Sequence, residues 1–254
     1  MNINEVLCLS TYAGKIMLES GAETYRVEET MNKISESLGV EVPDCYATPT
    51  VIIASAYHSG ETKSLVVRIS KRSVDLQKIH KVNDLARNIK NNNYNIEEIK
   101  KKLEEIDKEV RYSNKTTVLF SAIGAFAFVF LFGGSLRDAL SALIIGVIVK
   151  IFDILFQKIN LNSFFITTFC SSILAFIAIL TKKYGLSEDI DKVIIGSIML
   201  LVPGLAITNA MRDTIAGDLV SGVARGLEAF LTAIAVAVGT GVTLSFWISR
   251  FGGI

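Results

Sequence analysis

The chain has 254 residues, half of them hydrophobic, and a formal net charge of +1. This near-neutral charge provides no basic surface of the kind that binds nucleic acid. The three cysteines, Cys8, Cys45 and Cys170, are unevenly spaced and form no C-x-x-C motif, so we expect no disulfide framework, no metal site and no cofactor.

The distribution of charge divides the chain into two parts. Most charged residues precede Lys115, whereas the remainder is dominated by apolar runs close to the length of about 20 residues that spans a bilayer. We therefore predict an α+β protein, with a small soluble α/β domain over residues 1–113 and an all-α bundle of about five transmembrane helices over residues 114–254. No signal peptide is expected, because Glu5, Lys15 and Glu19 interrupt the first apolar residues.

The soluble part is expected to combine helices with a short β-structure. Apolar residues at helical spacing predict a first helix that ends near Ser20, and Gly39 is placed to end a second one. Asn95, with Glu98 three residues later, is typical of a helix N-cap. The expected elements are a helix over about Leu7–Met17, a helix over Glu23–Leu38, a β-hairpin or two neighbouring strands over Thr50–Tyr57 and Lys63–Ile69, and helices over Val74–Ile89 and Ile96–Val110.

The motif GAETYRVEET, from Gly21 to Thr30, opens the second helix. Steps of three and four residues put Glu23, Arg26 and Thr30 on one face. This face is either a solvated surface with local ion pairs or a contact surface for the membrane domain. Glu23 and Arg26 are the predicted domain contacts.

Five apolar segments follow, and each is a candidate transmembrane helix. They run over about Thr116–Phe132, Leu136–Phe156, Phe164–Leu180, Val193–Ile207 and Ala229–Ile248. The flanking lysines and arginines give a mild bias toward a cytosolic N-terminal domain, which Lys182 and Lys183 on the other side weaken. The absence of a signal sequence ahead of a hydrophilic domain of about 110 residues decides for this orientation. The residues then on or near the inner side are Lys108, Arg111, Lys115, Lys158, Arg212 and Arg225. An odd number of spans places the C-terminus outside.

Polar residues inside the second and third segments leave alternatives open. Lys150 and Asp153 are three residues apart and can pair, either reaching toward the cytosolic interface or facing a cavity. The third segment carries hydroxyl and thiol groups that either form hydrogen bonds between helices or line a pathway. These residues are Thr167, Thr168, Cys170, Ser171 and Ser172. Small residues in the fifth segment, and Gly222 and Gly226 before it, predict close helix packing.

The fourth segment is interrupted at Pro203–Gly204 and followed by a dense polar stretch. Proline removes a backbone donor and glycine weakens a helix, and interrupted hydrophobic helices point to transporter binding sites. If the chain continues as one helix, steps of four and three residues bring five polar side chains to one face. They belong to Thr214, Asp218, Ser221, Arg225 and Glu228. A bend near Gly217 is needed to bring Asn209 and Arg212 to the same side.

Two motifs together resemble the threonine/serine exporter family. They are GAETYRVEET and the stretch PGLAITNAMRDTIAGDLVSGVARGLEA, from Pro203 to Ala229. The chain looks especially like the N-terminal subunit of the family's split, two-protein branch, which is associated with succinate export. The resemblance implies a multi-pass inner-membrane exporter of small polar metabolites, either threonine/serine-type amino acids or dicarboxylates, and not an enzyme. Fused relatives continue with further membrane helices, whereas this chain stops at Ile254, so a second small integral membrane subunit is the expected partner.

We expect the cargo and coupling site within residues 203–228. The planar guanidinium fork suits carboxylates, so Arg212 and Arg225 are candidates for binding a cargo carboxylate. Asp218 and Glu228 are candidates either for a cargo ammonium group or for the proton that drives export, and Asp153 is a third coupling candidate. The full predicted substrate-binding set is Thr208, Asn209, Arg212, Asp213, Asp218, Ser221, Arg225 and Glu228.

Other readings of the sequence stay open at this point. The charges of residues 203–228 can neutralise one another in a cytosolic loop. The chain can also be a sensor or assembly subunit that does not itself transport. A membrane-anchored hydrolase is the third alternative, although no nucleophile, metal or phosphate-loop motif supports it. A homo-oligomer in the bilayer is also compatible with the sequence.

Overall fold

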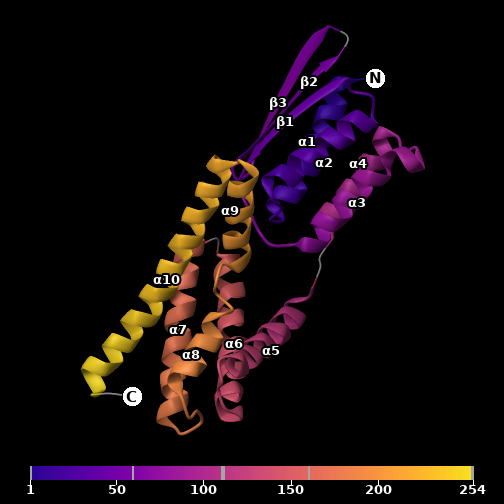
Figure 1. Ribbon diagram of the computed structural model, residues 1–254. Helices are drawn as coiled ribbons and strands as arrows, with labels where there is room; N and C mark the ends of the chain where they lie inside the picture. Colours follow the sequence, from indigo (N-terminus) through magenta and orange to yellow (C-terminus); the bar gives the residue numbers. More distant parts are fainter. Residues whose placement is uncertain (1, 59, 110–111, 160, 253–254) are drawn as a thin grey trace. The chain divides into compact units, whose positions relative to one another are not determined.

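Figure 1 shows the computed structural model, which describes residues 2–58, 60–109, 112–159 and 161–252. The chain packs into two compact units. The first unit comprises Met1–Arg111 and Leu205–Leu227, and the second comprises Tyr112–Gly204 and Glu228–Ile254. The predicted division placed everything after residue 113 in the membrane part, whereas the structure packs Leu205–Leu227 with the N-terminal residues.

The N-terminal part of the first unit contains the four expected helices, each with limits that differ by a few residues from the prediction. The predicted cap at Asn95 is confirmed: its side chain accepts a hydrogen bond from the Glu98 N–H, and the Glu98 carboxylate accepts one from the Asn95 N–H, each at 2.9 Å. Val110, expected at the end of the fourth helix, and Arg111 lie outside the described residues. The elements are α1 (Ile3–Glu19), α2 (Thr24–Ser37), β1 (Val42–Thr48), β2 (Val51–His58), β3 (Glu61–Arg68), α3 (Leu76–Asn92) and α4 (Ile96–Lys108).

The strand β1 was missed by the sequence analysis. The sheet has the order β1-β2-β3 with antiparallel pairs, so the expected hairpin is its second and third strands. Pro43 and Asp44 lie in β1, and both residue types are depleted in strands. Proline is tolerated here because β1 lies at the edge of the sheet, where a missing N–H donor need not interrupt a ladder.

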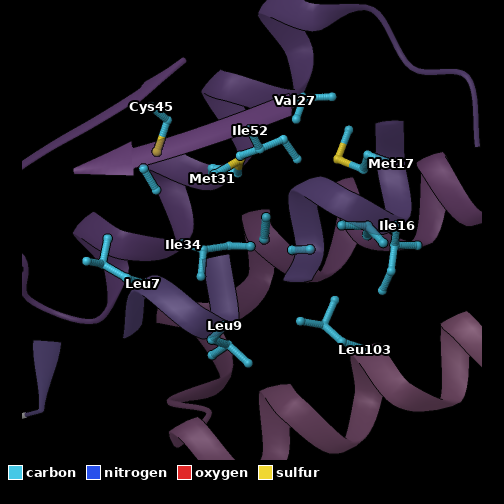
Figure 2. Packing of buried hydrophobic residues seen from close by; sticks show 14 of the residues in the cluster. Leu7, Leu9, Ile16, Met17, Val27, Met31, Ile34, Cys45, Ile52 and Leu103 are labelled. Atoms are coloured by element: carbon cyan, nitrogen blue, oxygen red, sulfur yellow. The ribbon is translucent and has the colours of Figure 1, made fainter. Parts of the chain in front are cut away.

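The core of the first unit lies between the helices and one face of the sheet. Figure 2 shows this packing, with Ile16 and Met17 from α1, Met31 and Ile34 from α2, and Ile52 from β2 among the labelled side chains. All five are at most 2% exposed. Burial of such side chains, each contributing about 1.5–3 kcal/mol, supplies the main stabilisation of this unit.

Four helices are long and apolar enough to cross a membrane, within the part of the chain that the structure describes. They are α5 (Asn114–Leu131), α6 (Leu136–Lys158), α7 (Ser163–Lys183) and α10 (Leu219–Phe251). The fourth expected span is not a continuous helix. It is divided between α8 (Ile190–Ile198), which ends before Pro203, and α9 (Gly204–Ala216), which begins after it.

The division of this span has a local cause. Proline lacks an N–H donor and disfavours helical backbone at the residue before it. The nine residues of α8 extend only about 14 Å at 1.5 Å per residue. This is about half of the roughly 30 Å hydrocarbon core of a bilayer, so α8 alone is too short to span.

Hydroxyl groups of α7 form hydrogen bonds to α10 inside the second unit. Ser171 donates to the Ala235 carbonyl at 3.4 Å, and Ser172 donates to the Gly239 carbonyl at 3.1 Å. A Cβ at Gly239 would meet the Ser171 side chain and the Ser172 backbone, so the two helices pack closely there. For these two serines the structure confirms the alternative of bonds between helices.

Candidate functional site

The polar stretch after Pro203 folds into a helical hairpin rather than one continuous helix. We call residues 205–227, which form α9 and the first turns of α10, the α9–α10 hairpin. Gly217 turns the chain with a φ of +98°, a backbone conformation that glycine adopts without strain. The Asp218 N–H then donates to the Asp213 carbonyl at 2.8 Å. The expected five-residue face is therefore wrong as one helical surface, because Thr214 lies on α9 and Ser221 and Arg225 lie on α10.

A glycine allows the two helices of the hairpin to approach each other. A Cβ at Gly222 would meet the Thr214 side chain and would lie 3.0 Å from the Thr214 nitrogen and 3.1 Å from the Ala210 oxygen. Gly226, one turn later, has more room, because its nearest neighbour is the Ala210 Cβ at 4.0 Å. The predicted close packing thus holds at Gly222.

The loop before α2 provides the surface on which the hairpin packs. Gly21 has a φ of +89°, and a Cβ added there would lie 3.0 Å from the Ser73 carbonyl oxygen. Glu23 is the N-cap residue of α2 but forms no side-chain capping bond. The first N–H groups of a helix need partners from outside the helix.

Asp213, 189 residues further along the chain, supplies one of these partners. Its Oδ1 accepts hydrogen bonds from the Thr24 N–H at 3.1 Å and from the Thr24 hydroxyl at 3.0 Å. A carboxylate at a helix N-terminus is also favoured by the helix dipole. Asp213 therefore caps α2 from the α9–α10 hairpin.

Asp213 also forms a buried ion pair with Arg225. The Arg225 Nε lies 3.1 Å from Asp213 Oδ2, and the two side chains are 8% and 0% exposed. Arg225 donates a further hydrogen bond to the Ala22 carbonyl at 2.6 Å. A buried ion pair contributes little to stability compared with apolar packing of similar volume, whereas loss of one partner leaves a buried charge uncompensated and is strongly destabilising.

A second ion pair and an amide bond complete the contact between the hairpin and the loop. Arg212 donates to Glu23, and Asn209 donates to the Gly21 carbonyl at 2.8 Å. Glu23 also pairs with Arg26 at 3.3 Å, which is the local ion pair expected from sequence. Glu23 is 7% exposed, so the alternative of a solvated face does not describe it.

A backbone hydrogen bond and two arginines together lower the pKa of the Glu23 carboxyl. Burial raises the pKa of the Glu23 carboxyl, but a hydrogen bond from its own backbone N–H, the bond from Arg212 and the charges of Arg26 and Arg212 outweigh burial. They hold the pKa below its usual value. Glu23 is thus an anion at neutral pH.

Asp218 and Glu28 are two further acidic residues near the first turns of α2. Asp218 Oδ2 accepts a hydrogen bond from the Thr24 hydroxyl at 3.0 Å. Glu28 lies four residues after Thr24 on α2, and its Oε1 accepts a bond from the Ala47 N–H at 2.7 Å. Burial, followed by the charges of neighbouring carboxylates, raises the pKa of Glu28. Those carboxylates belong to Asp218, Asp44 and Asp213.

The predicted site residues are therefore partly brought together. Those gathered at the N-terminus of α2 are Asn209, Arg212, Asp213, Asp218, Arg225 and the predicted domain contact Glu23. Ser221 is buried in α10 at 1% exposure, whereas Thr208 and Glu228 are exposed. The gathered side chains do not point into open solvent, because Asn209, Asp213 and Arg225 form hydrogen bonds to the loop over residues 21–24.

The third coupling candidate, Asp153, lies on α6 in the second unit. Its Oδ2 accepts from the Lys150 amino group at 2.6 Å, and its Oδ1 accepts from the Gln157 amide at 2.8 Å. The predicted pairing of Lys150 with Asp153 is confirmed.

Sequence reasoning missed the partners that the loop and α2 contribute, namely Gly21, Ala22, Thr24 and Glu28. The first three belong to the GAET segment of the quoted motif, so the motif itself was the available signal. Nothing local indicated which residues of Pro203–Glu228 they would contact. Within the described residues, no group of three or more His, Cys, Asp or Glu is placed to hold a metal ion.

The arrangement can bind small charged groups in two ways. Arg225 and Arg212 can exchange an internal carboxylate for that of another molecule, because both already hold a carboxylate. The acidic groups around Thr24 can bind a proton or a cationic group.

Comparison with known proteins gives one family over nearly the whole chain. A family model described as "Putative threonine/serine exporter" matches residues 9–247. A protein of Klebsiella aerogenes named "Probable succinate transporter subunit YjjP" is 22% identical over 91% of this chain and 90% of its own length. A protein of the same name from Escherichia coli is 20% identical over 95% of this chain and 93% of its own length.

A longer relative matches this chain with part of its length. A "Probable threonine/serine exporter" of Mycobacterium tuberculosis is 23% identical over 96% of this chain but over only 46% of its own length. No solved structure matches the chain at a significant level.

Proposed function

The chain belongs to the threonine/serine exporter family, whose members are membrane transporters rather than enzymes, and from this premise we propose its cargo, its site and its topology. The cargo is a small polar metabolite, either a threonine/serine-type amino acid or a dicarboxylate such as succinate. Relatives named for each of these cargoes support both classes.

The N-terminal part of the chain lies in the cytosol, and the apolar helices lie in the inner membrane. The basic residues near the first span, Lys108 and Lys115, support this orientation, because cytosolic flanks carry the excess of lysine and arginine. The helix α10 is longer than one crossing requires. Of its 33 residues about 20 suffice to span a bilayer, so its first turns, which carry Arg225, can extend beyond the hydrocarbon core.

The chain crosses the membrane five times, with the fourth crossing made by an interrupted segment. With the first unit on the cytosolic side, three crossings by the candidate spans α5, α6 and α7 bring the chain to the opposite side of the membrane. Because Leu205–Leu227 packs again in the first unit, the chain has to return between Lys183 and Leu205. The short helix α8 and the non-helical residues before Pro203 make this return. Irregular backbone at membrane depth is tolerated where it is covered by protein or lines a watered cavity, as in transporters.

The α9–α10 hairpin forms the cargo and coupling site, and the buried Asp213–Arg225 pair is the observation that carries this assignment. The pair lies at the start of α10, a continuous helix that goes on to form a candidate span. A cargo carboxylate replaces Asp213 on Arg225 or Glu23 on Arg212. Asp218 and Glu228 take a cargo ammonium group or the driving proton. The polar residues Thr208, Asn209 and Ser221 complete the set.

The transporter contains a second, small integral membrane subunit. Support comes from the two relatives named as transporter subunits, which align with this chain over 90% or more of their own length. Both subunits are embedded in the lipid bilayer.

Export from loaded cells tests the assignment. We expect Arg225→Ala and Asp218→Asn to reduce efflux of labelled threonine, serine or succinate at least tenfold, with membrane insertion unchanged. Arg250→Ala is the matched control, because Arg250 lies exposed in the last turn of the same helix. Wild-type efflux in both site variants would rule out the hairpin as the transport site.

A further inference from the structure

The helices α5 and α6 border an apolar groove on the surface of the second unit. They are consecutive antiparallel helices, and they approach closely where a Cβ added at Gly146 would lie 2.9 Å from the Ala122 Cα. Ala122 also lines the groove, where its short side chain leaves room. The walls include large, exposed apolar side chains of both helices, namely Leu119, Ile123, Ile151 and Leu155. The groove is therefore open to the surroundings of the helix pair.

The dimensions of the groove fit a hydrocarbon chain better than a helix. Along α6 the groove extends from Leu143 to Leu155, which is about 18 Å at 1.5 Å per residue. This length is close to the roughly 15 Å that one leaflet contributes to the hydrocarbon core of a bilayer. A volume of about 530 Å³ over this length corresponds to a mean cross-section of about 30 Å². An α-helix with its side chains, about 10 Å across, needs roughly 80 Å² and is too wide to enter.

One end of the groove is positively charged. Asn114 and Lys115 line it at the start of α5, and Leu155 lines it near the end of α6. Lys158 follows Leu155 by three residues, so it lies on the same face of α6. Both lysines are exposed, and neither forms an ion pair with another described residue. Two positive charges at this end are thus available to an anion.

The surroundings of the two lysines also favour an anion. The Asp153 carboxylate, in the same part of α6, is already paired with the Lys150 amino group at 2.6 Å. The first turn of α5 contains no acidic residue. The N-terminus of a helix carries a partial positive charge that favours phosphate groups. The net charge at this end of the groove is therefore positive.

We propose that the groove binds one acyl chain of an anionic phospholipid, and that Lys115 and Lys158 bind the negatively charged head group. The apolar walls hold the chain along α5 and α6 over the depth of one leaflet. The long, flexible lysine side chains let the ammonium groups reach the level of the head groups. Basic residues beside a pocket between membrane helices bind anionic lipids in this way. The site goes beyond the transport function proposed above and shares with it only the placement of α5 and α6 in the bilayer.

Photo-crosslinking of the full-length protein in phosphatidylcholine vesicles tests the position of the chain. The probe is a phosphatidylglycerol with a diazirine in its acyl chain, and we expect crosslinks to the groove residues of α5 and α6. Val147→Phe fills the groove and should lower their yield at least about fivefold. Ile144→Phe places the same ring at an exposed position of α6 that does not line the groove, and it is the matched control. Equal yields for the two variants would overturn the proposal.

Native mass spectrometry of the full-length protein tests the head group, with phosphatidylglycerol and phosphatidylcholine of identical acyl chains in equal amounts. The wild type should retain phosphatidylglycerol at least about fivefold more, as one or two lysines near a charged head group predict. Lys115→Gln/Lys158→Gln should bring the ratio of the two lipids close to one. Lys100→Gln/Lys101→Gln removes the same charge from exposed positions of α4 and should leave the ratio unchanged.

Glycerol phosphate, which has the head-group charge without acyl chains, distinguishes a lipid site from a site for free phosphate. At the concentration of the lipid it should not displace phosphatidylglycerol from the wild type. Three results would overturn the proposal: equal retention of the two lipids by the wild type, displacement by glycerol phosphate, or a second copy of the protein bound in place of the lipid.

Discussion

At the scale of single residues, the Asp213–Arg225 pair connects the sequence motif with the structure. Asp213 satisfies backbone and side-chain donors of Thr24, and Arg225 reaches both Asp213 and the Ala22 carbonyl. Neither charge is exposed by more than 8% of its side chain. Each of these two charges is stable in the protein interior only because the other charge and the loop before α2 replace the water that it has lost.

Asp213→Ala should therefore destabilise the protein strongly. The change leaves Arg225 buried without its carboxylate and removes the cap of α2, and breaking a buried pair costs about 3–5 kcal/mol. The measurement is the free energy of unfolding in detergent, followed by circular dichroism. Asp191→Asn is the control, with an expected change within about 0.5 kcal/mol. A loss below about 1 kcal/mol for Asp213→Ala would mean that the pair is not buried as described.

Glu28 provides a prediction about pH. Because its pKa in the folded protein is raised by burial and by neighbouring carboxylates, its contribution to stability is complete below the unfolded pKa of about 4.3 and is lost as the pH rises through the folded value. Glu28→Gln removes the charge, while its amide oxygen can still accept from the Ala47 N–H. The variant should be more stable than the wild type at neutral pH and equally stable in acid.

Unfolding curves at several pH values check this expectation. The neighbouring Glu29 is exposed, so Glu29→Gln should show no gain of stability that depends on pH. If Glu28→Gln is the less stable protein at neutral pH, the negative charge of Glu28 is needed in the fold, and our explanation of its raised pKa by burial and neighbouring carboxylates fails.

At the scale of elements, the turn at Gly217 decides where the charged residues go. A continuous helix from Gly204 would have spread them along one side, but the left-handed turn folds α10 back on α9. The close approach at Gly222 then sets the distance between the two helices. The hairpin therefore depends on two glycines whose roles differ.

Gly222→Ala and Gly226→Ala form a matched pair of variants within one helix. The methyl group at residue 222 has to displace the Thr214 side chain and presses on backbone atoms of α9, whereas residue 226 has room for it. Gly226→Ala should be neutral or stabilising by up to about 1 kcal/mol through helix propensity. Gly222→Ala should destabilise by about 1–3 kcal/mol, as overpacking does. Equal unfolding free energies for the two variants would contradict the close contact at Gly222.

At the scale of the whole molecule, the chain passes between its two units three times. The passages lie at Arg111–Tyr112, at Gly204–Leu205 and at Leu227–Glu228. The last of these lies inside α10, so one uninterrupted helix joins the charged hairpin to a candidate span. This connection is the reason for assigning transport to a segment that packs with the N-terminal part.

Labelling of Cys8 tests the proposed orientation. Cys8 is exposed, whereas Cys45 and Cys170 are buried, so a membrane-impermeant maleimide should react with Cys8 alone. We expect labelling in inside-out membrane vesicles and none in right-side-out vesicles. Cys8→Ser should abolish the signal and serves as the control. Labelling of right-side-out vesicles would place the N-terminal part outside the cell.

Much of the protein follows from its sequence, because the relevant signals are local. Lengths of apolar runs indicate the membrane helices, the Asn95–Glu98 spacing indicates a capping box, and Pro203 indicates the end of a helix. Each of these depends on residues within one or two turns of each other. The family resemblance, carried by two motifs, was likewise available from the sequence and is confirmed by the family match.

Tertiary structure alone decided how the two motifs are used. Thr24 and Asp213 are 189 residues apart, and no spacing rule connects residues at such a separation. Their contact depends on the fold of the loop at Gly21 and on the turn at Gly217, both of which place glycines at positive φ. The same holds for β1, whose pairing with β2 overrides the poor strand propensity of Pro43 and Asp44. Packing between distant segments, not local preference, brings the polar stretch after Pro203 to the N-terminus of α2, where Asp213 caps α2 and pairs with Arg225.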